Sequence, residues 1–158
     1  MRKAKIASIE QTETTALFSI VFEGEDESEF AKFQSKFIDN AKLVGDLRLI
    51  INVIEKMLKK GFEERNFRYE SKEKENVMAL PVYGSRLRLY CLRMSESVLI
   101  VGNGGVKNSR TYQENENLNG YVISLKELSK LLSADIKAGR VKLEEANLDG
   151  IDDLIYEI

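Results

Sequence analysis

The first sixty residues alternate between strand-like and helix-like spacing of apolar side chains. Residues 3–9 and 16–23 predict two strands, the second rich in β-branched and aromatic residues. A helix is predicted over residues 28–40, where apolar residues recur at helical intervals and Asp26 with Glu29 has the spacing of a capping box. The recurring residues, which we expect in the core, are Phe30, Phe33 and Phe37.

A longer helix is predicted to end at Lys60. Asp46 is its expected N-cap, and Gly61 suits the left-handed conformation that ends many helices. The apolar stripe of this helix consists of Leu47, Ile50, Ile51, Ile54, Met57 and Leu58. Residues 62–76 then lose periodicity and become rich in charge, which predicts a solvated loop or a strand with a loose end.

The second half of the chain predicts a group of strands followed by a helix. The strands cover residues 77–82, 86–93 and 98–102, with residues 94–97 as a tight hairpin connection. Ser124 and Glu127 have capping-box spacing, so a helix is expected over residues 124–138, with Gly139 as its stop. Residues 151–158 predict a closing strand or a docking tail.

Composition narrows the chemistry that is available to the protein. The 158 residues predict one α+β domain, which can bury a core without disulfides or metal. Cys91 is the only cysteine and histidine is absent, which excludes internal disulfides, nucleophile–histidine pairs and histidine-ligated metal. We therefore expect no metal and no cofactor. No segment approaches the roughly 18 apolar residues of a membrane span, so a cytoplasmic protein that does not contact membranes is expected.

Charge is distributed unevenly although the net charge is only −2. Residues 81–112 carry five basic side chains and one acidic side chain, whereas residues 113–158 carry five basic and ten acidic ones. A local cationic stretch in an acidic protein marks a candidate surface for binding anions. We therefore expect the functional surface to lie between Arg86 and Tyr112.

Two arginines in the predicted strand 86–93 suit the binding of an anion. Residues two apart share a face of a strand, so Arg86, Arg88 and Tyr90 are expected to project together. The pattern leaves an alternative equally open, in which the arginines pair with carboxylates on a solvated face. The glycines after the following strand favour a turn or bulge that directs Lys107 and Arg110 toward the arginine row.

This part of the chain resembles a known family. Residues 85–93 are Ser-Arg-Leu-Arg-Leu-Tyr-Cys-Leu-Arg, and residues 104–111, after a turn and an apolar strand, are Gly-Gly-Val-Lys-Asn-Ser-Arg-Thr. This order is similar to the end of the RelE/HigB-like toxins of bacterial toxin–antitoxin systems, in the RelE/ParE superfamily. Those proteins have an arginine-bearing strand, a hairpin, and an apolar strand leading into a Gly-x-Val-Lys-Lys-Thr-like segment before a helix.

The resemblance implies a small antiparallel sheet flanked by helices. Residues 1–25 would form an N-terminal hairpin extension, residues 26–138 a RelE-like core, and residues 139–158 an acidic tail or strand. It also implies a metal-independent messenger-RNA endonuclease that acts at the ribosome. An antitoxin would neutralise the toxin, and a helix-turn-helix protein is one expected type of antitoxin.

The resemblance also assigns roles to single residues. Arg88 matches the strand arginine of the family, and Lys107 matches the lysine after the second strand. The implied catalytic residues are Arg86, Arg88, Lys107 and Arg110, and the implied RNA-binding residues are Tyr90, Tyr112 and Arg93. Cleavage of RNA by its own 2′-hydroxyl needs an activator of that hydroxyl and cations for the phosphorane, and Lys107 suits the first role if neighbouring arginines lower its pKa.

Three hypotheses stay open at this point. The first is the RNA-cleaving toxin, and the second is a non-catalytic protein-interaction module of the same fold, with its arginines in ion pairs. The third is a ParE-like toxin that inhibits DNA gyrase. Fold alone does not choose among them. The sequence also leaves open whether the protein forms homo-oligomers, and whether the acidic residues 140–158 cover the cationic surface.

Overall fold

A seven-stranded sheet forms the centre of the computed structural model, which describes residues 1–70, 76–107 and 116–158. Its strands are β1 (Lys3–Gln11), β2 (Ala16–Phe22), β3 (Arg68–Tyr69), β4 (Val77–Leu80), β5 (Leu87–Arg93), β6 (Val98–Val106) and β9 (Tyr156–Glu157). Their order is β3-β4-β5-β6-β2-β1-β9, and neighbours are antiparallel except for β2 and β6, which are parallel. The α+β class is confirmed, but the sheet is larger than the small one expected and is mixed.

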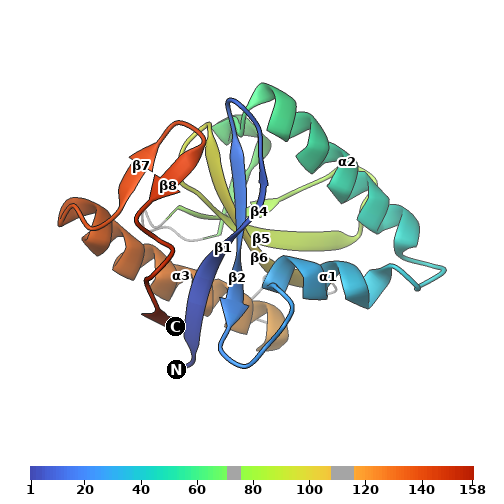
Figure 1. Cartoon of the computed structure of the whole chain (residues 1–158). Helices are drawn as coiled ribbons and strands as arrows, with labels where there is room; N and C mark the ends of the chain where they lie inside the picture. The colour runs from blue at the N-terminus through green and yellow to red at the C-terminus, as the bar shows by residue number, and fades with distance from the viewer. Residues whose placement is uncertain (71–75, 108–115) are drawn as a thin grey trace.

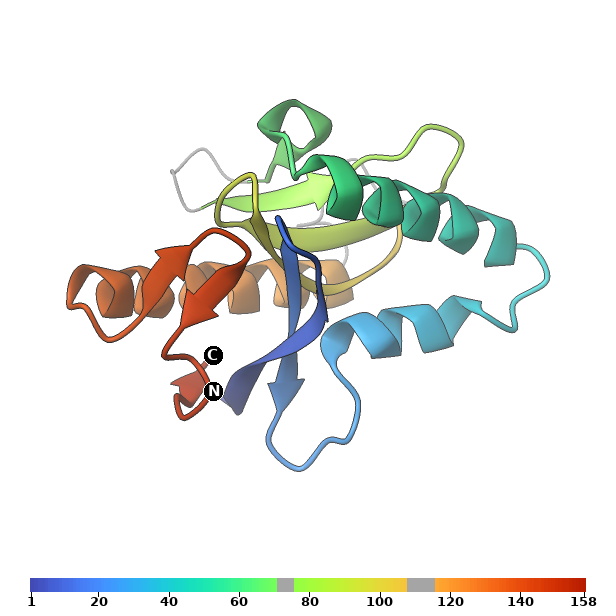
Figure 2. The same cartoon turned by 45° about the horizontal axis from the view of Figure 1, so that its top comes forward.

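Helices cover both faces of the sheet. The helices α1 (Glu29–Phe37) and α2 (Val44–Lys60) pack on one face, followed by a single 3₁₀ turn, η1 (Glu64–Asn66) (Figure 1). The helix α3 (Glu116–Lys137) and a hairpin of β7 (Lys142–Glu144) and β8 (Asn147–Asp149) cover the other face (Figure 2). Burial on both faces explains why β2 and the first half of β6 are almost continuously apolar. No helix in the described part of the chain is long and apolar enough to cross a membrane.

The two ends of the chain are part of this sheet. The N-terminal hairpin, which the resemblance implies as an extension, supplies β1 and β2, and β2 pairs with β6 from Ala16–Val98 to Ser19–Val101. The C-terminal segment supplies the β7–β8 hairpin and β9, which pairs with β1. The central position of β2 follows from its composition, because it has apolar side chains on both faces.

Some helix ends are as predicted and others differ. Gly61 ends α2 and Gly139 follows α3 with φ of 81°, so the positions of both stops are confirmed. Gly61 has φ of 103° and ψ of 160°, which is extended backbone that glycine permits and not the expected left-handed helical conformation. The N-cap of α1 is Ser28 rather than Asp26, since the Ser28 hydroxyl accepts a hydrogen bond of 3.1 Å from a backbone N–H of the first turn. Asp46 lies inside the first turn of α2 and is not its N-cap.

The helix α3 begins earlier than predicted. It starts at Glu116, so Ser124 lies within the helix and its capping-box role is wrong. Asn117, Asn119 and Gly120 have low helix propensity and obscure this first part, although apolar residues already follow the helical period there. Those residues are Leu118, Val122 and Leu125. Part of the predicted loop 62–76, residues 71–75, lies outside the described residues.

The glycines of β6 form the expected bulge within a strand that continues to Val106. Leu89 pairs with Gly104, whereas Cys91 pairs with Val101, so β6 holds one extra residue here. The Asn103 side chain stabilises the bulge, because its Oδ1 accepts a bond of 2.8 Å from the Gly104 N–H. A Cβ atom at position 104 would overlap the backbone carbonyl of β5, which requires glycine there.

The bulge predicts that Gly104→Ala destabilises the protein by more than about 2 kcal/mol, because backbone rather than a flexible side chain must shift. The matched control is Gly45→Ala in α2, where a Cβ meets nothing within 4 Å. The control should be neutral or stabilising by up to about 1 kcal/mol, because alanine favours helices. Urea unfolding of both variants measures the difference, and equal stability of the two would contradict the close approach.

Candidate functional site

Arg88 and Lys107 lie close together on the face of the sheet that α3 covers. Arg88 is opposite Gly105 in the β5–β6 ladder, and the Lys107 N–H donates to the Arg86 carbonyl at 3.2 Å, which continues the pairing beyond β6. Strand alternation directs Arg88 toward α3, together with Tyr90. Two of the predicted catalytic residues are therefore side by side at one end of the sheet.

Arg68 and Glu70 complete this group, which we name the basic cluster: Arg68, Glu70, Arg88 and Lys107. Arg68 pairs with Ala79, and Glu70 continues the same ladder, so both face α3. Burial raises the pKa of Glu70, against the effect of the three nearby cations. Burial, followed by Arg88 and Arg68, lowers the pKa of Lys107, against the effect of Glu70.

The basic cluster has an excess of positive charge. It contains three cations and one carboxylate, and no ion pair within it is found among the described residues. Arg88 Nη1 and Glu70 Oε1 are buried and have no hydrogen-bond partner in the described part of the chain. Buried polar atoms without partners cost free energy, and the excess of positive charge makes the basic cluster attractive to anions.

Arg86 does not belong to this cluster. Its Nε donates to Asp46 Oδ2 at 3.0 Å, its backbone N–H donates to the same oxygen at 2.7 Å, and its Nη2 donates to the Lys42 carbonyl at 2.6 Å. These bonds hold the pKa of Asp46 below its usual value. The expected row of Arg86 with Arg88 is therefore corrected: β5 begins at Leu87, and Arg86 turns toward α2 on the other face.

The other predicted residues lie elsewhere. Tyr90 is only 1% exposed and packs in the core beneath α3, so it presents no surface for a base. Arg93 faces α2, where its Nε donates to the Phe62 carbonyl at 2.6 Å. Arg110 and Tyr112 lie outside the described residues. Cys91 is buried, and its burial raises the pKa of its thiol.

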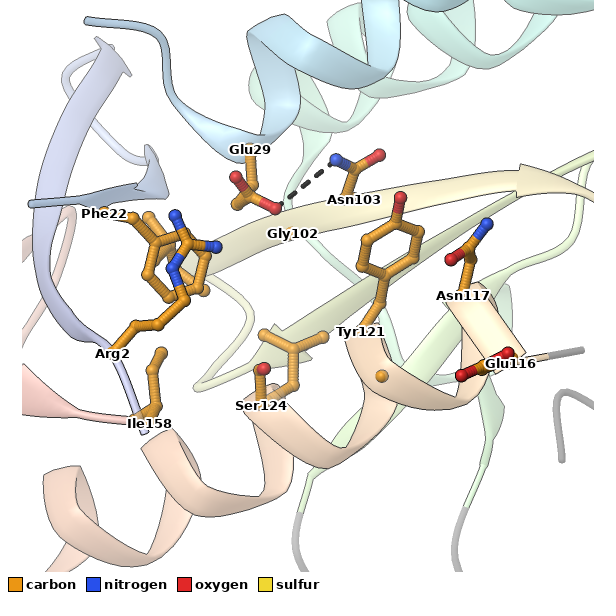
Figure 3. A pocket seen from close by; sticks show the side chains of 13 residues that line it. Arg2, Phe22, Glu29, Gly102, Asn103, Glu116, Asn117, Tyr121, Ser124 and Ile158 are labelled. Atoms are coloured by element: carbon orange, nitrogen blue, oxygen red, sulfur yellow. Dashed lines mark hydrogen bonds between the residues drawn. The ribbon is translucent and has the colours of Figure 1, made fainter. Parts of the chain in front are cut away.

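A polar cleft opens where the sheet splits between β2 and β6. Their pairing stops at Ser19–Val101, although β6 continues to Val106. The Ser19 hydroxyl donates to the Val101 carbonyl at 2.7 Å and accepts from the Phe30 N–H at 3.1 Å, which fixes the start of α1 over the split. The cleft has a volume of about 360 Å³ and lies between α1 and α3 (Figure 3).

Two buried polar side chains form one wall of the cleft. Glu29 is 6% exposed and Asn103 is 3% exposed. Asn103 Nδ2 donates to Glu29 Oε1 at 3.3 Å, as the dashed line in Figure 3 shows, and Lys32 donates to Glu29 Oε2 at 2.6 Å. Tyr121 rises from α3 on the facing wall, with its hydroxyl directed toward α1.

Lys36 of α1 reaches the rim of this cleft. Its Nζ donates to the Gly104 carbonyl at 2.6 Å and to the Tyr121 hydroxyl at 3.2 Å. Burial of the ammonium group lowers the pKa of Lys36 to about 8, and burial raises the pKa of Tyr121. An amine that is partly neutral near pH 8 and a protonated phenol therefore lie side by side.

Sequence patterns did not reveal this cleft. Its residues come from the N-terminus, β2, α1, β6 and α3, and no motif joins them. Glu29 and Lys36 have the spacing of an ordinary solvated helix face, and Asn103 stands among glycines that favour a turn. The one usable signal in the sequence was Asn103, a polar residue directly after the predicted apolar strand 98–102.

Comparison of the chain with protein-family models, with curated proteins and with solved structures gives no match. Within the described residues, no three cysteine, aspartate or glutamate side chains come together in a way that could hold a metal ion.

The position of Lys36 predicts a lysine that titrates at about 8, whereas ordinary lysines titrate near 10.4. Carbon-13 NMR of the lysine ε-methylenes over pH 6–11 measures this, and Lys36→Met assigns the signal. Between these two pKa values the folded state binds fewer protons than the unfolded state, so Lys36 makes stability rise with pH there. Titration of Lys36 together with the other lysines would contradict the described burial.

Proposed function

We propose that the protein binds RNA phosphates through Arg68, Arg88 and Lys107 and acts as a RelE/HigB-like toxin, a metal-independent ribosome-associated mRNA endonuclease. The observation that carries the proposal is the position of Arg88 and Lys107. These two residues, which match the family's motif, lie together in a group with excess positive charge. The order of elements is consistent with the resemblance, since two helices precede β4–β6 and α3 follows them.

The proposed chemistry uses the basic cluster as follows. Lys107, with its lowered pKa, accepts the proton of the RNA 2′-hydroxyl. The 2′-oxygen then bonds to phosphorus as the bond to the 5′-oxygen breaks, and the 5′-oxygen takes a proton from water, leaving a cyclic phosphate and a free 5′-hydroxyl. Arg88 and Arg68 stabilise the charge of the phosphorane. Arg68 has the phosphate-binding role that the resemblance implied for Arg86, because the Arg86 guanidinium is bound to Asp46.

A second candidate is a non-catalytic protein-interaction module of the same fold. It is favoured by the structural use of three predicted site residues: Arg86 in an ion pair, Tyr90 in the core, and Arg93 bonded to a backbone carbonyl. These contacts explain those residues without any substrate. The two candidates predict different effects on RNA binding and cleavage when the Arg88 and Lys107 side chains are removed.

The test compares the wild type with Arg88→Ala/Lys107→Ala. We expect the double variant to bind a single-stranded RNA oligonucleotide at least tenfold more weakly, because two phosphate contacts are lost. The slope of log K against log salt should become shallower by about 1.4, or about 0.7 for each lost contact to a single strand. Fluorescence anisotropy between 25 and about 200 mM salt measures both quantities.

The matched control is Lys59→Ala/Lys60→Ala, which removes the same charge from the exposed end of α2. It should leave both RNA affinity and slope close to the wild-type values. Expression in a bacterial host then separates the candidates: growth arrest with cleaved mRNA in the wild type and the control, but not in Arg88→Ala/Lys107→Ala, supports the toxin. Harmless expression of the wild type with intact mRNA favours the non-catalytic module.

A further inference from the structure

The polar cleft between β2 and β6 is a second site, and the charges beside its buried wall are paired. Arg2 pairs with Glu25 at 3.1 Å, and Lys32 pairs with Glu25 at 3.0 Å and with Glu29 at 2.6 Å. Glu116 also lines the cleft but is exposed, so a charged ligand that reached Glu29 and Asn103 would leave water without finding an uncompensated counter-charge beside them. The buried wall therefore suits a neutral ligand.

The walls of the cleft favour a flat ligand. The Arg2 guanidinium lies 4.0 Å from the centre of the Phe22 ring, and both residues line the cleft (Figure 3). Planar guanidinium groups and aromatic rings offer stacking surfaces for other rings. Gly120 of α3 also lines the cleft, and a Cβ there would meet nothing within 4 Å, so its lack of a side chain leaves open space for a ligand.

The Glu29–Asn103 pair offers an acceptor beside a donor. The two atoms that meet, Glu29 Oε1 and Asn103 Nδ2, are 3.3 Å apart. The amide nitrogen carries a second hydrogen, and the carboxylate oxygen has a further lone pair. The complement is a ligand edge on which an amino group stands next to a ring nitrogen, as in adenine and cytosine.

We propose that this cleft binds a neutral, planar, amino-substituted heterocycle of the nucleobase type. Its amino group donates to Glu29 Oε1, its ring nitrogen accepts from Asn103 Nδ2, and its ring stacks beside Arg2. The Tyr121 hydroxyl, which accepts from Lys36, can donate its own hydrogen to the ligand. The proposal does not depend on RNA cleavage, because the residues of the basic cluster are not among those that line the cleft.

The test is calorimetric titration of the full chain with adenosine and with purine riboside, which lacks the amino group. We expect adenosine to bind about tenfold more tightly or better, because purine riboside cannot donate the hydrogen bond to the charged Glu29. Arg88→Ala/Lys107→Ala should bind adenosine as the wild type does. That result keeps this proposal separate from the proposed function.

A blocking variant locates the binding. Gly120 lies in α3, and a Cβ there meets nothing within 4 Å, so Gly120→Leu should fold and place its side chain in the cleft. It should weaken adenosine binding at least tenfold while its thermal midpoint stays at or above the wild-type value. Gly45→Leu, at an equally open position in α2, is the matched control and should bind normally.

Three outcomes would overturn the proposal. One is the absence of adenosine binding at concentrations up to about 5 mM, because a preformed site should have a dissociation constant below that value. Another is equal affinity for purine riboside, which would remove the role of the Glu29–Asn103 edge. The third is normal adenosine binding by Gly120→Leu, which would place the ligand elsewhere.

Discussion

The parallel pairing of β2 with β6 is the contact on which the rest of the structure depends. It joins the N-terminal hairpin to the antiparallel strands β3–β6, so that one sheet can carry helices on both faces. Ser19 is completely buried at the end of this pairing and links both strands to the first turn of α1 through its hydroxyl. Because the pairing stops there, the two strands diverge beyond Ser19 and leave room for polar side chains inside an otherwise apolar sheet.

Local patterns predicted most of the elements but not how they assemble. Apolar periodicity and glycine stops act within a few residues, and they located β2, β5, α1 and α2 to within a few positions. Apolar side chains on both faces of β2 suit a central strand, but the choice of β6 as its partner is a long-range one that a local pattern does not contain. The start of α3 was missed for a related reason: packing of Leu118 and Val122 outweighs the poor helix propensity of their neighbours.

The same limit holds for the candidate site: local patterns predicted some of its residues, and contacts between distant parts of the chain decide the others. Strand alternation put Arg88 and Tyr90 on one face of β5, and Lys107 lies near Arg88, where the bulge in β6 was expected to direct it. The position of Arg86 could not be predicted, because its partner Asp46 lies 40 residues away in sequence, on α2. Arg68 and Glu29 were missed because single charged residues carry no local signal, and only the folded sheet gives them neighbours.

The outer edge of the sheet also has a consequence for solubility. In the described part of the chain β3 and Glu70 cover β4 from Val77 to Ala79, so Leu80 lies beyond that cover. The next residue is Pro81, the only proline, which has no backbone N–H to donate to an incoming strand. A second molecule that approached this edge would find the hydrogen-bond ladder interrupted after one residue, so the proline protects the protein against edge-to-edge aggregation.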